Sequence, residues 1–264
     1  MTRGELRHYI EATVAVHRPT FFVDRLFRTN EEWDRISAYE IRNVSLSSTT
    51  EASLDDVLTH RTVVLLGEPG SGKSTVARAA VETVAAKGWV PLVGSLRSYT
   101  GDLATLLASG APAALIVGEP VDGAPVTRVL ILDGFDEIRH EQLDRFVADL
   151  TANLQRDATL RLLLTARQAF YEANRGRFAS PPEAFYLLGF TDRNIRQYVD
   201  HGGGGYDAFM QEVNRVGVGQ EIANPFALET LFHTFTKGQS LGRLRHEAVS
   251  SVVESLIARP AVTA

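Results

Sequence analysis

The sequence predicts an α/β fold: a parallel sheet with helices on both faces, in three layers, followed by a small helical subdomain. Between about residues 62 and 165, short apolar runs typical of buried strands alternate with segments of helical periodicity. Beyond about residue 186, only helical patterns follow. A chain of 264 residues is long enough for one α/β domain and a smaller helical one.

The first strand and the first helix of the core enclose a glycine-rich loop. Residues 62–66 form a short apolar run, and residues 74–87 form a helical pattern rich in alanine and valine that Gly88 closes. The next strand is predicted at 89–93. Pro91 lies within it and favours a strand start or an edge strand, because proline has no N–H group to donate within a sheet.

The rest of the core continues the alternation. A short helix at 103–109, with Asp102 as its N-cap, precedes a nearly continuous apolar strand at 126–132. Residues 141–155 form an amphipathic helix, and residues 160–165 form another strand. Strands separated by helices predict a parallel sheet. Right-handed connections then bring the carboxyl ends of the strands to one edge, where ligands bind.

The flanking segments are helical or irregular. Short helices are expected at 5–16 and 51–58 in a polar N-terminal lead-in. Further helices are expected after Thr191, at 206–216, at 226–235 after Asn224-Pro225, and at 244–258, with the glycines 202–205 as a flexible break. The predicted domains are therefore a lead-in at 1–55, the α/β core at 56–185, and the helical subdomain at 186–264.

Composition excludes several classes of protein. The chain is 44% hydrophobic and 22% charged, which is typical of a globular protein. It has no cysteine, so disulfides and thiolate metal sites are excluded. No apolar run approaches the ~20 residues of a membrane span, and a net charge of −5 does not favour nucleic acid. We expect a cytoplasmic protein with no membrane contact and no clear nucleic-acid site.

The glycine-rich loop carries the strongest functional signal. Its sequence fits the phosphate-binding pattern G-x-x-x-x-G-K-[ST] between a strand and a helix, which predicts a P-loop NTPase. Backbone N–H groups of the loop and the start of the helix are expected to bind phosphate. Lys73 is expected to contact the β- and γ-phosphates, and the Ser74 hydroxyl to bind Mg²⁺. The expected loop residues are Gly67, Glu68, Pro69, Gly70, Ser71, Gly72, Lys73 and Ser74.

Charged residues follow two further strands. Asp133 comes after four apolar residues, at the end of a buried strand where a carboxylate can hold Mg²⁺. Asp136 and Glu137 lie shortly after it, and either could orient or deprotonate an attacking water; the sequence does not decide between them. Arg167 lies just after the strand predicted at 160–165. Its guanidinium could stabilise charge that develops on a γ-phosphate.

Together these stretches resemble the NACHT branch of the STAND signalling NTPases. The loop at 67–75 and the segment at 130–137 carry the resemblance, with Gly134 as the small residue after the aspartate and Asp136 and Glu137 as the later acids. Other similar segments are 89–97, 163–167 (the sensor segment), 185–199 and 224–228. The resemblance covers about residues 55–235.

The resemblance implies an ATP-driven switch that uses ATP, ADP and Mg²⁺. It adds Thr75 to the nucleotide-binding loop and places Pro225 near the adenine. In such proteins the ADP state is closed, and exchange for ATP permits self-association, which activates an attached effector. Many bacterial members serve in defence against phage. No effector or sensor is visible here, so we expect a piece of a longer protein or a minimal member that uses partner chains.

Other functions are compatible with the same core. The chain could be a nucleotide-binding assembly module with negligible hydrolysis. It could also be a P-loop kinase, for which Arg175 and Arg177 are ambiguous candidates for lid arginines, or an ATPase that remodels nucleic acid. The pattern alone does not distinguish ATP from GTP. The preference for ATP comes from the resemblance.

Overall fold

The computed structural model describes residues 1–29, 51–239 and 241 of the chain. The chain divides into two compact units. The first comprises Met1–Gly67 and Lys73–Leu187, and the second comprises Glu68–Gly72 and Leu188–Ala264. The middle of the glycine-rich loop is therefore grouped with the helical part of the chain. The helix predicted at 244–258 lies outside the described residues.

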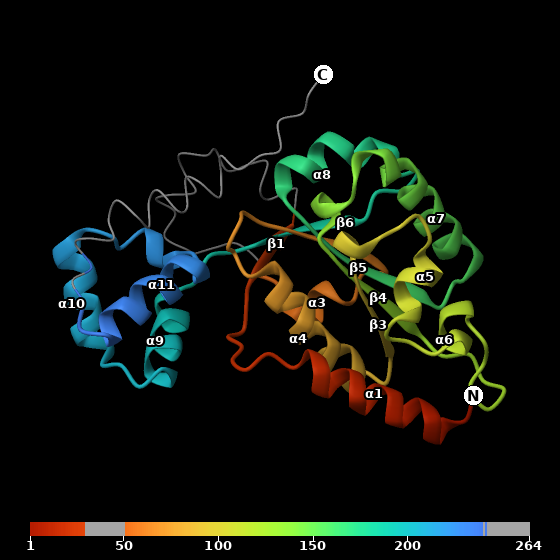
Figure 1. Ribbon diagram of the computed structural model, residues 1–264, viewed down its shortest axis with the longest axis horizontal. Coiled ribbons are helices and arrows are strands. Elements are labelled where there is room, and N and C mark those ends of the chain that lie inside the picture. The colour runs from red at the N-terminus through yellow and green to blue at the C-terminus, as the bar shows by residue number, and fades with distance from the viewer. Residues whose placement is uncertain (30–50, 240, 242–264) are drawn as a thin grey trace. The chain divides into compact units, whose positions relative to one another are not determined.

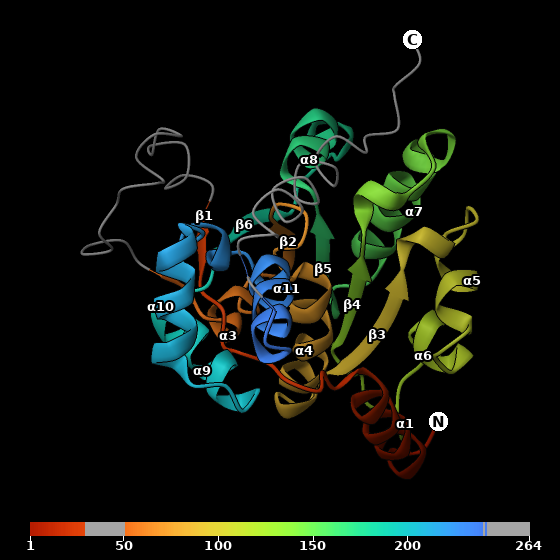
Figure 2. The ribbon, with the colours of Figure 1, turned by 60° about the vertical axis from the view of Figure 1, so that its left-hand side comes forward.

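A six-stranded sheet forms the centre of the first unit. Its strands are β1 (Phe27–Thr29), β2 (Thr62–Leu66), β3 (Val90–Ser95), β4 (Arg128–Asp133), β5 (Leu160–Ala166) and β6 (Glu183–Leu187). Their order across the sheet is β1-β6-β2-β5-β4-β3. All neighbours pair in parallel except β1, which is antiparallel to β6. Figure 2 shows β3, β4 and β5 side by side, with their arrowheads pointing the same way.

The four strands predicted from apolar runs are all present. β3 is an edge strand, as Pro91 predicts, and Pro91 lies opposite Val129 of β4. Two strands were missed. β6 follows a Pro-Pro pair and is short, and β1 consists of three residues whose partners, such as Leu187 for Phe27, lie far away in the sequence. The sheet is therefore mostly parallel, with one antiparallel edge.

Helices cover both faces of the sheet, which confirms the three-layer prediction (Figure 1). On one face lie α3 (Leu54–Val57) and α4 (Lys73–Ala86), and on the other α5 (Leu103–Ala108), α6 (Ala113–Val117), α7 (Leu143–Arg156) and α8 (Gln168–Asn174). The N-terminal helix α1 (Arg3–His17) lies beside β3, where the Tyr9 hydroxyl donates to the Pro91 carbonyl at 2.7 Å.

In the described residues of the second unit, three longer helices surround an apolar core. They are α9 (Asp192–His201), α10 (Tyr206–Val216) and α11 (Pro225–Thr236). Thr191 caps α9, and its hydroxyl accepts the Asn194 N–H. Asn224 caps α11, with Pro225 as the first helical residue. Both helix starts agree with the capping signals in the sequence.

The glycines between α9 and α10 break the helix as predicted, but two of them are tightly packed rather than simply flexible. A Cβ atom on Gly202 or on Gly204 would lie 2.4 Å from the Phe232 ring. We expect Gly204→Ala to lower the free energy of unfolding of this unit by about 1–3 kcal/mol, because overpacking forces a packed neighbour to move.

The matched control for this prediction is Gly205→Ala. Gly205 has an ordinary φ of −75°, and the nearest atom to its added Cβ would be 3.9 Å away. We expect this change to alter stability by less than about 0.5–1 kcal/mol, because the restriction of the unfolded chain by alanine opposes the preference for glycine over alanine at the N-cap of α10. Urea denaturation followed by circular dichroism measures both variants, and equal losses would contradict the packing argument.

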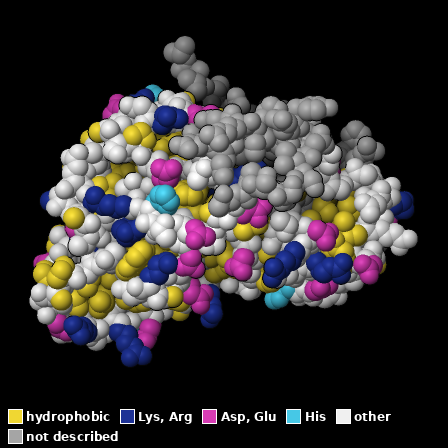
Figure 3. Space-filling view, turned by 180° about the vertical axis from the view of Figure 1, so that it is seen from behind, with side chains coloured by type: hydrophobic (Ala, Val, Ile, Leu, Met, Phe, Trp, Pro, Cys, Tyr) yellow, Lys and Arg dark blue, Asp and Glu magenta, His cyan; other side chains and the backbone are white. Residues whose placement is uncertain are grey.

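The surface carries charges of both signs. In Figure 3, Lys and Arg side chains are interspersed with Asp and Glu side chains on the face that is drawn. Large hydrophobic side chains that are exposed include Val16, Val117 and Phe226. None of the helices in the described part of the chain is long and apolar enough to cross a membrane.

Candidate functional site

The glycine-rich loop joins β2 to α4 at the carboxyl end of a buried strand. Gly70 and Gly72 have φ angles of +74° and +89°, which glycine adopts without strain. Lys73 is the first residue of α4, and its Nζ donates to the Gly67 carbonyl at 2.7 Å. Of the other predicted loop residues, Ser71 is buried, Pro69 and Thr75 are half-buried, and Glu68 and Ser74 are exposed. Glycine at positions 70 and 72 therefore allows the backbone of this loop to turn with positive φ angles.

Within the second unit, the start of α11 contacts the middle of this loop. Asn224 Nδ2 donates to the Pro69 carbonyl at 3.1 Å, and the Phe226 N–H donates to the Gly70 carbonyl at 3.3 Å. The Pro69 carbonyl and the Gly70 N–H belong to the same trans peptide group and point in opposite directions. Because the carbonyl faces Asn224, the Gly70 N–H faces away from Asn224. Pro225, which the resemblance alone places near the adenine, lies in the chain between these two contact residues.

Asp133 is the last residue of β4 and is half-buried. The Thr165 hydroxyl, from β5, donates to Asp133 Oδ1 at 2.5 Å. The N–H of Gly134 donates to the same hydroxyl oxygen at 2.9 Å. Gly134 has a φ of +87°, and a Cβ there would lie 3.2 Å from the Glu137 side chain. The positive φ angle at this position therefore favours glycine after Asp133.

The two acids after Gly134 are each paired with an arginine. Asp136 accepts the backbone N–H of Arg167 at 3.0 Å and pairs with Arg167 Nε at 2.8 Å. Glu137 pairs with Arg97 Nε at 2.9 Å. The side chain of Asp136 is 11% exposed and that of Glu137 is 39% exposed. Phe135, between Gly134 and the acids, is buried against other aromatic rings and anchors the turn.

These residues share one edge of the sheet. β5 lies between β2 and β4, and β3 lies beyond β4. The loop follows β2, Arg167 follows β5, Asp133 ends β4, and Arg97 follows β3. Because parallel strands end on the same side, cationic and acidic groups gather at this edge. Lys73, at the start of α4, and Asp133, at the end of β4, both lie at this edge.

The structure brings Arg167 and Asp136 into direct contact, and both were predicted from the sequence. Three contributors were not singled out as site residues. All three fall within segments that carry only the resemblance, 89–97, 163–167 and 224–228. Thr165 is the one hydroxyl residue in a largely apolar strand, and Asn224 is also a helix cap. A polar residue at the end of a buried strand is the signal that could have identified Thr165.

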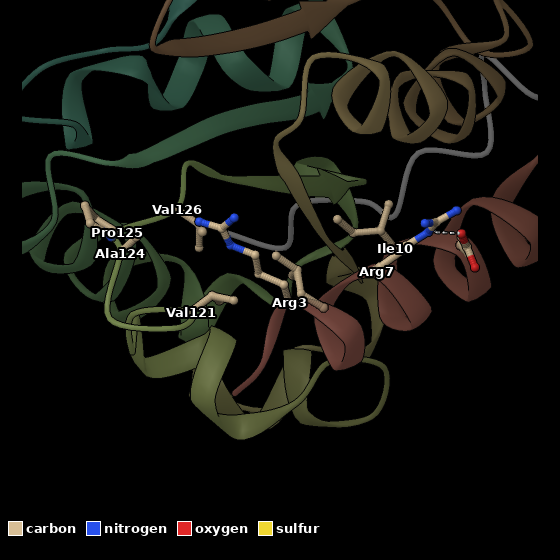
Figure 4. Close-up of a pocket in the computed structure, with 9 residues that line it drawn as sticks. Arg3, Arg7, Ile10, Val121, Ala124, Pro125 and Val126 are labelled. Carbon is tan, nitrogen blue, oxygen red and sulfur yellow. Dashed lines mark hydrogen bonds and ion pairs between the residues drawn. The ribbon is translucent and has the colours of Figure 1, made fainter.

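A cavity of about 510 Å³ lies elsewhere in the first unit, between α1 and the segment that precedes β4. Figure 4 shows Arg3, Arg7 and Ile10 of α1 near the segment that holds Val121 and Val126. Arg7 is paired with Glu11 at 2.8 Å. Since this segment leads into the first residue of β4, the cavity lies at the amino end of the strand and Asp133 at the other end. We therefore do not assign the cavity to the nucleotide site.

Comparison with known proteins identifies the family of the chain. The family model of the NACHT domain matches residues 61–202, more than half of the chain. The matched segment includes Lys73, Asp133, both acids and Arg167. No curated protein sequence matches the chain. Among solved structures, the crystal structure of Saccharomyces cerevisiae RIF2 matches with a TM-score of 0.43 and 10% sequence identity, covering 89% of this chain and 88% of that one. From the family match, the chain belongs to the NACHT-domain family of nucleotide-binding NTPases.

Proposed function

We propose that the chain binds ATP with Mg²⁺ in the cytoplasm and hydrolyses it slowly, and that its nucleotide state controls conformation and self-association. The observation that carries the proposal is the group at the carboxyl edge of the sheet. There, the strand that ends in Asp133 continues into two acids, each held by an arginine from a neighbouring strand end. An edge with a phosphate-binding loop and an acid pair supports phosphoryl transfer to water better than simple anion binding.

The proposed binding roles follow from position. Backbone N–H groups of the loop and the Lys73 ammonium would bind the phosphates, with Thr75 beside them and Pro225 near the adenine. Ser74 and Asp133 would hold Mg²⁺, which neutralises charge on the phosphate oxygens when it is bound. The sulfur-free, oxygen-based ligands of this pair suit Mg²⁺.

The burial of the two acids favours different roles for them. Asp136 is nearly buried and is held twice by Arg167, so we assign it to positioning that arginine. Glu137 is more exposed and makes its ion pair with Arg97, whose side chain is 78% exposed. Glu137 can therefore exchange this partner for water, and we assign it to activating the attacking water. The pairing of Arg167 uses Nε, which leaves its terminal N–H groups to stabilise a γ-phosphate.

A second candidate function is a nucleotide-binding assembly module with negligible hydrolysis. The observation that favours it is that both acids are engaged in ion pairs, so neither carboxylate is poised for water in this conformation. The kinase and remodelling alternatives have no comparable support. Turnover of ATP by the wild type, measured against a Lys73→Ala baseline, separates the two candidates: a rate above the baseline supports the enzyme, and equal rates with nucleotide bound support the module.

The proposed signalling role is inferred from the family to which the chain belongs. Because the chain belongs to the NACHT-domain family, we propose that it works as a switch between an ADP state and an ATP state, and that it serves in bacterial defence against phage. Effector and sensor functions would come from other segments or from partner chains.

If the chain is such a switch, its oligomeric state changes when ATP replaces ADP. We expect the mean mass in solution, measured by light scattering during size-exclusion chromatography, to rise when Mg²⁺ and a slowly hydrolysed ATP analogue replace ADP. The control is the Lys73→Ala variant, which is expected to show no such change. A wild-type mass that is the same with both nucleotides would contradict the switch while leaving nucleotide binding intact.

A further inference from the structure

We propose that Thr165 is a positioning residue that sets the Asp133 carboxylate for Mg²⁺ and fixes the turn that carries the acid pair. The proposal rests on the proposed nucleotide function and deepens it. Thr165 is 1% exposed in a strand whose neighbouring buried residues are apolar. A buried hydroxyl is costly unless it is hydrogen-bonded, so its place here calls for a specific partner.

The sheet places Thr165 between the two halves of the site. It lies on β5, opposite Leu65 of the loop-bearing strand β2, and β4 with Asp133 is on its other side. Leu163 and Ile131 pack in the core beneath α4. Side chains two residues apart in a strand share a face, so Thr165 and Asp133 lie on the face that α4 covers. That is the helix whose first residues are Lys73 and Ser74.

The donor and acceptor roles of the Thr165 hydroxyl can be assigned in only one way. A hydroxyl has a single proton and can accept as well as donate. The oxygen of Thr165 accepts the Gly134 N–H at 2.9 Å, so the proton is left for Asp133 Oδ1, 2.5 Å away. Oδ1 is thereby engaged, and the carboxylate is held in one orientation. Oδ2 is the oxygen left to face a metal ion or its water.

The Thr165 hydroxyl also fixes the start of the turn that carries Asp136 and Glu137. Gly134 has left-handed backbone geometry, and its N–H is tied to Thr165. The Glu137 side chain folds over Gly134. One buried hydroxyl therefore connects the proposed metal ligand with the proposed catalytic acid. Groups that orient a metal ligand in this way commonly contribute 10- to 100-fold to metal affinity or activity, an order-of-magnitude range.

The test compares Thr165→Val, which keeps the shape but loses the hydroxyl, with Thr165→Ser, which keeps the hydroxyl. Binding of a fluorescent ATP analogue to the full chain is titrated across Mg²⁺ concentrations and also in EDTA. We expect Thr165→Val to raise the Mg²⁺ concentration for half-maximal enhancement of binding by about 10-fold or more. Thr165→Ser should stay within about 3-fold of the wild type, and binding in EDTA should be similar for all three.

A double-mutant cycle with Asp133→Asn identifies the partner. If Thr165 acts through Asp133, Thr165→Val should have little further effect on Mg²⁺ dependence in the Asp133→Asn background. Additive effects would overturn the proposal. Should the valine variant not fold in a thermal melt without nucleotide, Thr165→Ala carries the same expectation, since it also lacks the hydroxyl.

The outcomes separate this inference from the function beneath it. Wild-type binding that depends on Mg²⁺, together with unchanged dependence in the hydroxyl-free variant, overturns the role of Thr165 and leaves the nucleotide function standing. A serine variant as impaired as the valine variant also overturns it, because the methyl group would then be the important feature. Failure of the wild type to bind the analogue in any condition overturns the proposed function and this inference together.

Discussion

The Lys73→Ala variant is expected to bind ATP at least about 100-fold more weakly than the wild type. The ammonium group stands at the start of α4, where it would make charge-assisted hydrogen bonds to two phosphates. Each such bond contributes about 1.5–3 kcal/mol, and about 1.4 kcal/mol corresponds to a factor of ten. The loss of ATP affinity can be measured from the stability of the protein, because ATP at about 100 times its Kd adds about 2.7 kcal/mol to the free energy of unfolding. We expect the thermal shift caused by Mg²⁺ and ATP to disappear in this variant.

Lys87→Ala is the matched control for this variant. Lys87 lies just beyond the other end of α4, where it pairs with Asp55 at 2.6 Å. The substitution removes the same charge far along the helix from the loop. We expect the control to keep the shift caused by ATP. A shift of wild-type size in Lys73→Ala, or equal losses in both variants, would contradict the assignment of the loop.

The Glu137→Gln variant is expected to hydrolyse ATP at least about 100-fold more slowly, with ATP affinity within about 3-fold of the wild type. General-base catalysis typically contributes 10²- to 10⁴-fold, and glutamine keeps the size of glutamate without its basicity. Steady-state phosphate release gives the rate, and titration with a fluorescent ATP analogue gives the affinity. Equal losses of turnover and of binding would argue for a metal-holding or structural role.

Asp136→Asn distinguishes the two acids. Asparagine can still accept the Arg167 N–H, but it loses the ion pair with Nε. We expect a smaller loss of turnover than in Glu137→Gln, because the water-activating carboxylate remains. If Asp136→Asn proves the more damaging change, the two assignments must be exchanged.

Much of the core could be predicted because its signals are local. The strands β2, β4 and β5 are largely apolar runs, and α7 has a clear amphipathic period. β1 could not be predicted, since three residues with Arg28 at the centre pair with a strand more than 150 residues away. α6 is only five residues long, and its end depends on Gly118 at φ +82°. Elements this short are decided by tertiary contacts rather than by propensity.

In the candidate site too, some residues have local sequence signals and others depend on tertiary contacts. The loop and Asp133 were predictable because each is a short contiguous motif. The partners of the acids were not fully predictable, because they depend on which strands are neighbours. Arg97 and Arg167 meet the acid pair because β3 and β5 flank β4, an order that no local pattern specifies. Thr165 reaches Asp133 for the same reason.

We propose that this chain binds an adenine nucleotide at the edge of the sheet that holds Lys73 and Asp133. Calorimetric titration of ATP, and separately of GTP, into the nucleotide-free protein with Mg²⁺ tests it most directly. We expect ATP to bind at a single saturable site with a stoichiometry of about one, as for one loop per chain, and GTP to bind more weakly. The absence of saturable binding of either nucleotide at millimolar concentration, or a clear preference for GTP, would contradict the account.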